Sequence, residues 1–295
     1  MTGRERGFLL LTSKLGDPNR RVLTVSQLRD LTLRARQMGK PAVDRDMTLE
    51  DLMRLGCSRS FSARVLMLLE EEDRLDRYLL AGEREGCAAV TRLTECYPAS
   101  LREAMGTDAP GSLWARGDLS VLEGPMVALV GSRDLNGENR EFAYEVGRQA
   151  ARQGYTLVSG NARGADSVAQ NACLSHGGRV ISIVADRLCS QRPAQRILYL
   201  SEEGFDMPFS SYRALSRNHV IHALGEKVFV AQCSWGKGGT WSGTTDNLRR
   251  NRRPVFCFDD GSSAMKELQQ LGATLISRDA LADIAALRQP ELRFL

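Results

Sequence analysis

The sequence has no apolar run of about 18 residues, the length that a membrane-spanning helix needs, so no transmembrane segment is expected. Near the N-terminus only residues 8–11 are continuously apolar, which is too short for the core of a signal peptide. Internal repeats and low-complexity linkers are also missing. We therefore expect a cytoplasmic protein of about two domains without a membrane partner.

Metal-ligating side chains are scarce. The seven cysteines include no CxxC pair, and His219 and His222 lie three residues apart without a third ligand beside them. Reduced cysteines that pack as small apolar side chains are the simplest interpretation. We expect no metal, no cofactor and no set of catalytic residues.

Lysine is scarce too. Only five of the 40 basic residues are lysine, the rest are arginine, and the net charge is +4. The planar guanidinium group suits bidentate contacts with phosphate and stacking on bases. A codon bias toward arginine explains the count equally well. The composition therefore supports a nucleic-acid ligand without establishing one.

Residues 1–90 are predicted to form a helical domain. Apolar side chains recur at helical spacing over residues 22–38, and further helices are expected at 48–55, after Ser58 or Ser60, and at 73–85. Thr48 suits a helix N-cap, and Gly56 suits a helix end. This pattern resembles a small SAM-like or helix–hairpin–helix bundle that binds DNA or a protein. A bundle without a ligand is the simpler interpretation.

Residues 91–295 alternate between predicted strands and helices. The strands are expected at 126–130, 155–158, 179–185, 227–231, 254–258 and 274–276, and the helices at 138–153, 166–176, 193–200, 212–224, 242–251 and 265–271. The alternation predicts an α/β fold: a Rossmann-like, doubly wound, mostly parallel sheet with helices on both faces. In such sheets ligands bind outside the carboxyl ends of the strands, so the loops that follow the strands matter most.

Two of these loops combine glycine with arginine. The first is Gly-Ser-Arg at 131–133, and the second is Ser-Gly-Asn-Ala-Arg-Gly-Ala-Asp at 159–166, which leads into a helix. The N–H groups of a helix N-terminus favour anions, and Arg163 adds a full charge beside them. Asp166 is expected to cap this helix. Neither a Walker ending nor GxGxxG is present, so the second loop is predicted to be an anion cradle of another kind.

A third loop, residues 234–244, carries four glycines, a lysine and two tryptophans. It suits a backbone approach to phosphate with an indole for base stacking, although Trp241 packed on the sheet is an alternative. A basic cluster at 249–253 complements a helix dipole or contacts phosphates. The candidate phosphate- or nucleic-acid-binding residues are Gly131, Ser132, Arg133, Ser159, Gly160, Arg163, Gly164, Asp166, Arg217, Asn218, Lys237, Gly238, Gly239, Thr240 and Trp241.

These motifs together resemble the DNA-processing protein A (DprA/Smf) family. The matching segments are 131–133, 159–166, Gly-Gly at 177–178, Arg-Asn at 217–218, the loop at 238–241, Tyr-Pro-x-x-Leu at 97–101 and Pro-x-x-Leu at 110–113. The resemblance implies a non-enzymatic protein that binds and protects single-stranded DNA, loads the recombinase RecA during DNA uptake or recombination, and forms a homodimer. Trp241 or His219 would stack on bases.

The chain departs from the family pattern at several positions. Gln170 stands where the family usually has histidine, and His219 where it usually has a second arginine. Gly-Gly-Thr-Trp-Ser-Gly-Thr at 238–244 replaces a Ser-Gly-Ser-x-x-Thr-Ala loop, and no C-terminal winged helix is expected. These departures indicate a divergent member and bear on natural transformation more than on nucleic-acid binding.

Two other functions remain open on the residues alone. The loop at 238–244 partly resembles the Pro-Gly-Gly-x-Gly-Thr loop of LOG-type phosphoribohydrolases, whose catalytic glutamate has no match here; Asp246 is the nearest carboxylate. A nucleotide-sensing module of the same superfamily would bind a mononucleotide without turnover. The number of arginines and stacking surfaces favours a longer strand.

Overall fold

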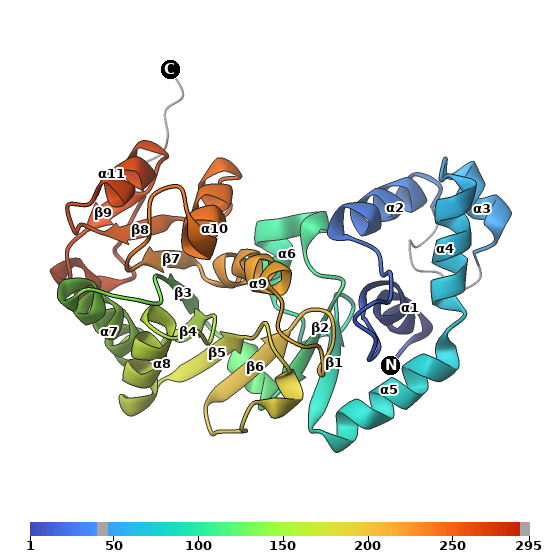
Figure 1. The fold of residues 1–295 in the computed structure, drawn as a ribbon, viewed down its shortest axis with the longest axis horizontal. Coiled ribbons are helices and arrows are strands. Elements are labelled where there is room, and N and C mark those ends of the chain that lie inside the picture. Colours follow the sequence, from blue (N-terminus) through green and yellow to red (C-terminus); the bar gives the residue numbers. More distant parts are fainter. Residues whose placement is uncertain (40–46, 290–295) are drawn as a thin grey trace. The chain divides into compact units, whose positions relative to one another are not determined.

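The computed structural model describes residues 1–39 and 47–289, which divide into two compact units (Figure 1). The first unit contains Met1–Arg116 and two later segments, Asp186–Gln191 and Leu200–Pro208. The second unit contains the rest. A domain boundary at residue 90 stays a prediction. Over the two described ranges, no helix is long and apolar enough to cross a membrane.

Helices dominate the first unit. They are α1 (Gly3–Thr12), α2 (Val25–Gln37), α3 (Leu49–Arg54), α4 (Arg59–Leu69), α5 (Glu72–Arg84) and α6 (Ala99–Met105). The hydroxyls of Thr2, Thr24, Thr48 and Ser58 each accept a backbone N–H at the start of a helix, which confirms Thr48 as an N-cap. Two antiparallel strands complete the unit, β1 (Cys87–Thr91) and β2 (Ser112–Arg116).

An aromatic cluster holds the segment Leu200–Pro208 within the first unit. The ring of Tyr78 stacks on Phe205 at 4.4 Å between centroids and meets Trp114 edge-on at 5.0 Å. The Tyr78 hydroxyl donates to Asp206 Oδ1 at 2.5 Å and accepts the Phe205 N–H at 3.1 Å. Residues from α5 and from a loop more than a hundred positions later therefore share one core.

The second unit contains the parallel sheet. Its strands are β3 (Met126–Val130), β4 (Thr156–Ser159), β5 (Arg179–Ile183), the first part of β6 (Ile197–Ser201), β7 (Lys227–Val230), β8 (Val255–Phe258) and β9 (Thr274–Ile276). They are ordered β6-β5-β4-β3-β7-β8-β9. The pairs β3/β4, β4/β5, β3/β7, β7/β8 and β8/β9 are all parallel. Strand β3 is buried along its whole length, because strands flank both its edges and helices cover both its faces.

Helices cover both faces of this sheet. They are α7 (Gly137–Arg152), α8 (Ala165–Ser175), α9 (Ser211–Leu224), α10 (Gly238–Arg249) and α11 (Ser263–Gln270). Figure 1 shows α7 and α8 on one side of the sheet and α9 and α10 on the other. From β3 the chain adds strands in one direction, and from β7 it adds them in the other, so the order reverses at the β3–β7 pair. The doubly wound α/β prediction is confirmed.

Helices α7 and α8 approach each other closely at Gly147. A β-carbon on Gly147 would lie 2.1 Å from the carbonyl oxygen of Ala169, a distance that no real contact reaches. Only glycine allows the two helices to pack at this separation.

Three predicted elements differ in the structure. Residues 197–201 form strand β6, so the helix predicted at 193–200 is wrong; the side chains alternate in burial with the period of a strand. Residues 87–91 form strand β1, within a stretch that was predicted to be helical. Helix α10 begins at Gly238, four residues before the predicted start, so part of the third loop is helical.

Candidate nucleic-acid interface

A cavity of about 560 Å³ lies at the switch point of the sheet, which we call the switch-point cavity. Its walls come from the carboxyl end of β3, the segment between β7 and α10, and one face of α9. Open α/β sheets bind ligands at this place because neighbouring connections leave on opposite faces of the sheet.

The first loop is fixed by backbone contacts on both sides. The Ser132 N–H donates to the carbonyl oxygen of Gln232 at 2.8 Å, and the Ser132 carbonyl accepts the Ala165 N–H at 3.1 Å. A β-carbon on Gly131 would lie 2.5 Å from that of Ala165, so glycine is required there. The loop therefore projects Arg133 into solvent from a rigid base.

The second loop depends on left-handed backbone at Asn161 (φ 58°) and Gly164 (φ 87°). A β-carbon on Gly164 would lie 2.4 Å from the carbonyl oxygen of Arg133, so the first two loops are in contact. The N-cap of α8 is Gly164, not Asp166, which corrects the predicted capping role. The Asp166 carboxylate instead accepts the N–H of Ala162 at 3.1 Å and braces the loop from inside.

A buried carboxylate and a buried guanidinium form the floor of the cavity. Burial raises the pKa of Asp166 to about 6, opposed by the charge of Arg217 and by the N–H groups of Ala162 and Gly160. Arg217 on α9 donates to the carbonyl oxygen of Ile183 at 2.6 Å. The Arg217 guanidinium lies over Gly160, where a β-carbon would come within 2.7 Å of it. A positive charge is thus held in place where water has little access.

The third wall is the N-terminus of α10. Lys237 occupies its N-cap position and is exposed. The Thr240 hydroxyl donates to the carbonyl oxygen of Gly131 at 3.0 Å, and the Asn218 amide donates to that of Gly239 at 3.0 Å. These bonds join α10 to the first loop and to α9. Gly238, Gly239 and Thr240 of the first helical turn line the cavity, and the N–H groups of a first helical turn favour anions.

The structure brings most of the predicted site residues together. Ten line the switch-point cavity: Gly131, Ser132, Arg133, Asp166, Arg217, Asn218, Lys237, Gly238, Gly239 and Thr240. Ser159, Gly160 and Trp241 do not, and Arg163 and Gly164 line a neighbouring groove together with Arg133. Arg163 is exposed and pairs with Asp134 at 2.8 Å.

Gln170 explains why Ser159 lies behind the cavity. Its buried amide donates to the hydroxyls of Ser159, at 2.6 Å, and Ser182, at 3.3 Å. Gln170 therefore links β4 to β5, so this glutamine has a structural role at a position where the family usually has histidine.

Sequence reasoning missed several lining residues at the start of α9. Phe209 and Leu215 line the cavity with large exposed apolar surfaces. The exposed Trp235 lies in the third loop, next to the lining residue Ser234. Arg213 is buried and donates to the carbonyl oxygen of Ala185 at 2.8 Å. Arg213 does not line the cavity, but its spacing of four from Arg217 places both on one face of α9.

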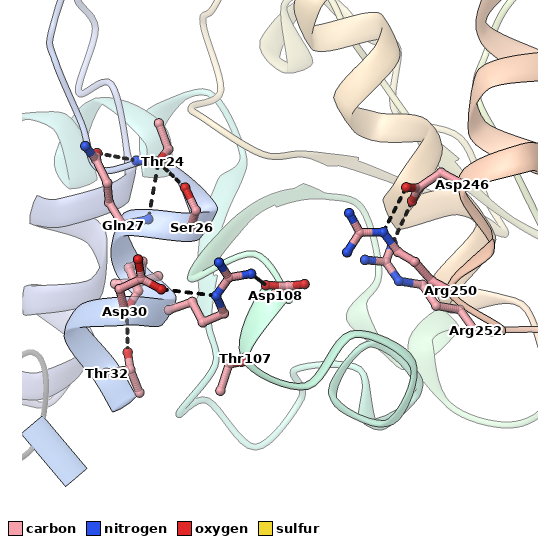
Figure 2. A network of polar contacts seen from close by, with 12 residues as sticks. Thr24, Ser26, Gln27, Asp30, Thr32, Thr107, Asp108, Asp246, Arg250 and Arg252 are labelled. Carbon is pink, nitrogen blue, oxygen red and sulfur yellow. Dashed lines mark hydrogen bonds and ion pairs between the residues drawn. The ribbon is translucent and has the colours of Figure 1, made fainter. Parts of the chain in front are cut away.

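The basic cluster at 249–253 lies at the other end of α10, away from the cavity. Figure 2 shows Arg250 and Arg252 pointing at Asp246, with nitrogen–oxygen distances of 2.8 Å and 3.4 Å. Asp246 also lies 3.2 Å from His219 Nδ1. Arg253 donates to the carbonyl oxygen of Ala223 at 3.2 Å. The cluster thus takes part in local contacts that close the helix end.

Two histidines follow Arg217 on α9. Neither His219 nor His222 lines the cavity. His222 is fully buried, and its two ring nitrogens have no hydrogen-bond partner among the described residues. Burial lowers the pKa of His222 to about 3. Over residues 1–39 and 47–289, no three histidine, cysteine or acidic side chains gather as a metal site would require.

Comparisons with known proteins agree with this architecture. The DNA processing protein DprA of Streptococcus pneumoniae (strain R6) is 28% identical over 258 residues, which cover 82% of this chain and 88% of the relative. The Smf protein of Escherichia coli K12 is 31% identical over 200 residues, 62% of this chain and 52% of the relative.

Solved structures give the same result. The crystal structure of S. pneumoniae DprA superposes with a TM-score of 0.72 at 26% identity, over 96% of this chain and 98% of that one. DNA processing protein A from Helicobacter pylori, solved to study its single-stranded DNA binding mode, gives a TM-score of 0.56 at 23% identity, over 66% and 94%. The family profile described as DNA recombination-mediator protein A matches residues 88–286. This match spans more than half of the sequence, and the chain belongs to the DNA recombination-mediator protein A family.

Proposed function

We propose that this protein binds single-stranded DNA without turnover and mediates the loading of a RecA-type recombinase during DNA uptake or recombination in the cytoplasm. The observation that carries the proposal is the convergence of three cationic side chains on one cavity: exposed Arg133 and Lys237, and buried Arg217. A helix N-terminus faces the same space. A second copy of the chain and the recombinase are the proposed partners.

The cavity suits one or a few phosphodiesters of a longer strand. Arg217 supplies a charge that is fixed before the ligand arrives, while Arg133 and Lys237 can move to follow the backbone. Contacts from these cations to phosphates carry no sequence information, so binding is expected to be tolerant of sequence. Its main energetic term is electrostatic, which makes it sensitive to salt.

Exposed aromatic side chains beside the cavity suit base stacking. Phe209 is 57% exposed and lines the cavity, and Trp235 is 63% exposed next to the lining residue Ser234, so both rings are accessible to a base. Trp241 is half-buried on α10 and lies outside the cavity lining. We therefore propose Phe209 and Trp235 as the stacking surfaces ahead of Trp241 and His219.

The relatives support the same proposal. Two carry the name DNA processing protein, and the H. pylori homologue was solved to study how it binds single-stranded DNA.

The LOG-like alternative needs a carboxylate that reaches the substrate. Asp246 is bound to arginines away from the cavity, and Asp166 is the one carboxylate among the described lining residues. Release of free base from a nucleoside monophosphate would support that alternative.

The test is a titration of fluorescent oligothymidylate at two salt concentrations, with duplex and mononucleotide as competitors. Affinity should fall steeply as salt rises, and Arg133→Ala and Lys237→Ala should each weaken binding and reduce the salt slope by about one. Arg152→Ala is the matched control, because Arg152 is exposed at the far end of α7. Two results would overturn the proposal. One is an affinity that changes neither with salt nor with either substitution, and the other is a mononucleotide that competes as well as the oligonucleotide.

A further inference from the structure

A second open groove adjoins the switch-point cavity. It has a volume of about 680 Å³ and lies between α7 and α8; we call it the α7–α8 groove. Arg133 lines both the cavity and the groove. A strand whose phosphate sits in the cavity can therefore leave over Arg133 and enter the groove without a gap in the lining.

Polar side chains face this groove from both helices. On α7, Arg140 and Tyr144 are one turn apart and share a face. On α8, Ser167 and Asn171 have the same spacing. Hydroxyl, amide and guanidinium groups at helical intervals are the side chains that contact sugar and phosphate without regard to sequence.

The charge of the groove favours an anion at the end near Arg133. The Asp134 carboxylate pairs with Arg163 at 2.8 Å, which neutralises one of the two acids in the lining, the other being Glu141. Among the described residues, neither Arg133 nor Arg140 forms an ion pair with a carboxylate of the groove. Two exposed cations therefore lie along the route that begins at the cavity.

Tyr144 provides a flat surface within the groove. Its side chain is partly exposed, and the ring of His176 meets it edge-on at 6.1 Å between centroids and 81° between planes. The His176 ring is itself anchored, because Nδ1 lies 2.8 Å from the carbonyl oxygen of Ala172. The ring of Tyr144 is thus partly exposed within the groove beside an anchored neighbour, and an exposed aromatic ring is the kind of group on which a base stacks.

We propose that the α7–α8 groove is a second subsite for the same single strand, in which Arg140 contacts a phosphate and Tyr144 stacks on a base. The proposal rests on the proposed function, since it extends the strand that the cavity holds. It makes the binding site longer than the cavity and gives it a length requirement.

The test compares labelled oligothymidylates of about five and about twenty nucleotides, lengths that bracket the range of single-strand sites. Tyr144→Leu should weaken binding of the long oligonucleotide at least about fivefold, as stacking energies lead us to expect, and leave the short one unchanged. Arg140→Ala should also weaken binding of the long oligonucleotide alone, and should reduce its salt slope by about one. Tyr144→Phe should retain the affinity of the wild type because it keeps the ring. Arg152→Ala, on the same helix outside the groove, is the control.

Three outcomes overturn the inference: equal affinity of the wild type for both lengths, equal losses for both lengths, or no loss with either groove variant. A groove that serves a protein partner would give the last of these. Failure of the wild type to bind any oligonucleotide would instead overturn the proposed function, so the two failures can be told apart. Thermal unfolding of each variant checks that these surface substitutions leave the fold intact.

Discussion

The guanidinium of Arg217 packs directly over the backbone of Gly160, beneath the switch-point cavity. A β-carbon on Gly160 would lie 2.7 Å from the central carbon of that guanidinium and 2.8 Å from both terminal nitrogens. The distance is shorter than real β-carbon contacts, so any side chain at position 160 would push the Arg217 guanidinium out of its place.

Gly160→Ala should therefore displace Arg217 and weaken binding of single-stranded DNA. Loss of a hydrogen bond to a charged group is worth about 1.5–3 kcal/mol, or roughly ten- to more than a hundredfold in affinity. Gly137→Ala is the control, because a β-carbon there meets nothing within 4 Å. Fluorescence titration measures both variants, and equal affinities for the two would show that the position of Arg217 does not matter.

Binding should strengthen as the pH falls through about 6. The pKa of Asp166 is raised to about 6 by burial, so its carboxylate is ionised at neutral pH and loses its charge below that value. Phosphodiesters do not titrate in this range, and a neutral Asp166 no longer repels them. The affinity for single-stranded DNA can rise at most about tenfold per pH unit, because only one proton is bound. Asp166→Asn keeps an acceptor for the Ala162 N–H. This variant should bind with an affinity that does not change between about pH 5.5 and about pH 7.5. A variant that retained the pH dependence of the wild type would contradict this assignment.

Acid should destabilise the fold through His222. Its pKa is lowered to about 3 in the folded protein from 6.5, by burial first and then by the neighbouring His219. Above pH 6.5 both states are neutral; as the pH falls further the unfolded chain binds a proton that the folded chain does not, so stability is lost. The free energy of unfolding should drop by about 2 kcal/mol between pH 8 and pH 5 from this group.

His222→Leu is the variant that isolates this effect. Since both ring nitrogens lack a partner among the described residues, leucine should leave stability at pH 8 unchanged or higher. Urea unfolding at several pH values then gives the difference between variant and wild type. Parallel curves across the range would show that His222 does not contribute to the acid sensitivity.

Tyr78→Phe should destabilise the first unit. The substitution keeps the aromatic stack with Phe205 but removes the acceptor of the buried Phe205 N–H and the donor to Asp206. An unsatisfied buried group costs about 1–3 kcal/mol, which chemical unfolding can resolve. Tyr199→Phe serves as the comparison, because burial alone raises the pKa of that tyrosine. Equal stabilities of the two variants would mean that the hydroxyl of Tyr78 contributes nothing.

The sheet and the glycine- and arginine-bearing loops that follow its strands could be predicted, because both depend on local sequence patterns. A short apolar run such as Met126–Val130, bounded by Pro125 and Gly131, is typical of a buried strand that ends at a tight loop. The role of Asp166 could not be predicted, because a cap and an internal brace occupy nearly the same position and differ only in where the Ala162 N–H lies. The early start of α10 could not be predicted from the sequence either, because the helix begins with Gly238 and Gly239, and glycine disfavours helices. Its first turn is set by tertiary contacts with Asn218, which leave no room for a β-carbon at Gly239.

The contact between Gly147 and Ala169 has a consequence for recognition. It fixes two helices whose N-termini follow the first and second loops, so the spacing of those loops is set by packing on the opposite side from α9 and α10. The anion sites are therefore already ordered before a single strand of DNA binds, so binding loses little entropy in ordering them. The spacing of the anion sites around the switch-point cavity is in this sense decided by helix packing on the opposite face of the sheet.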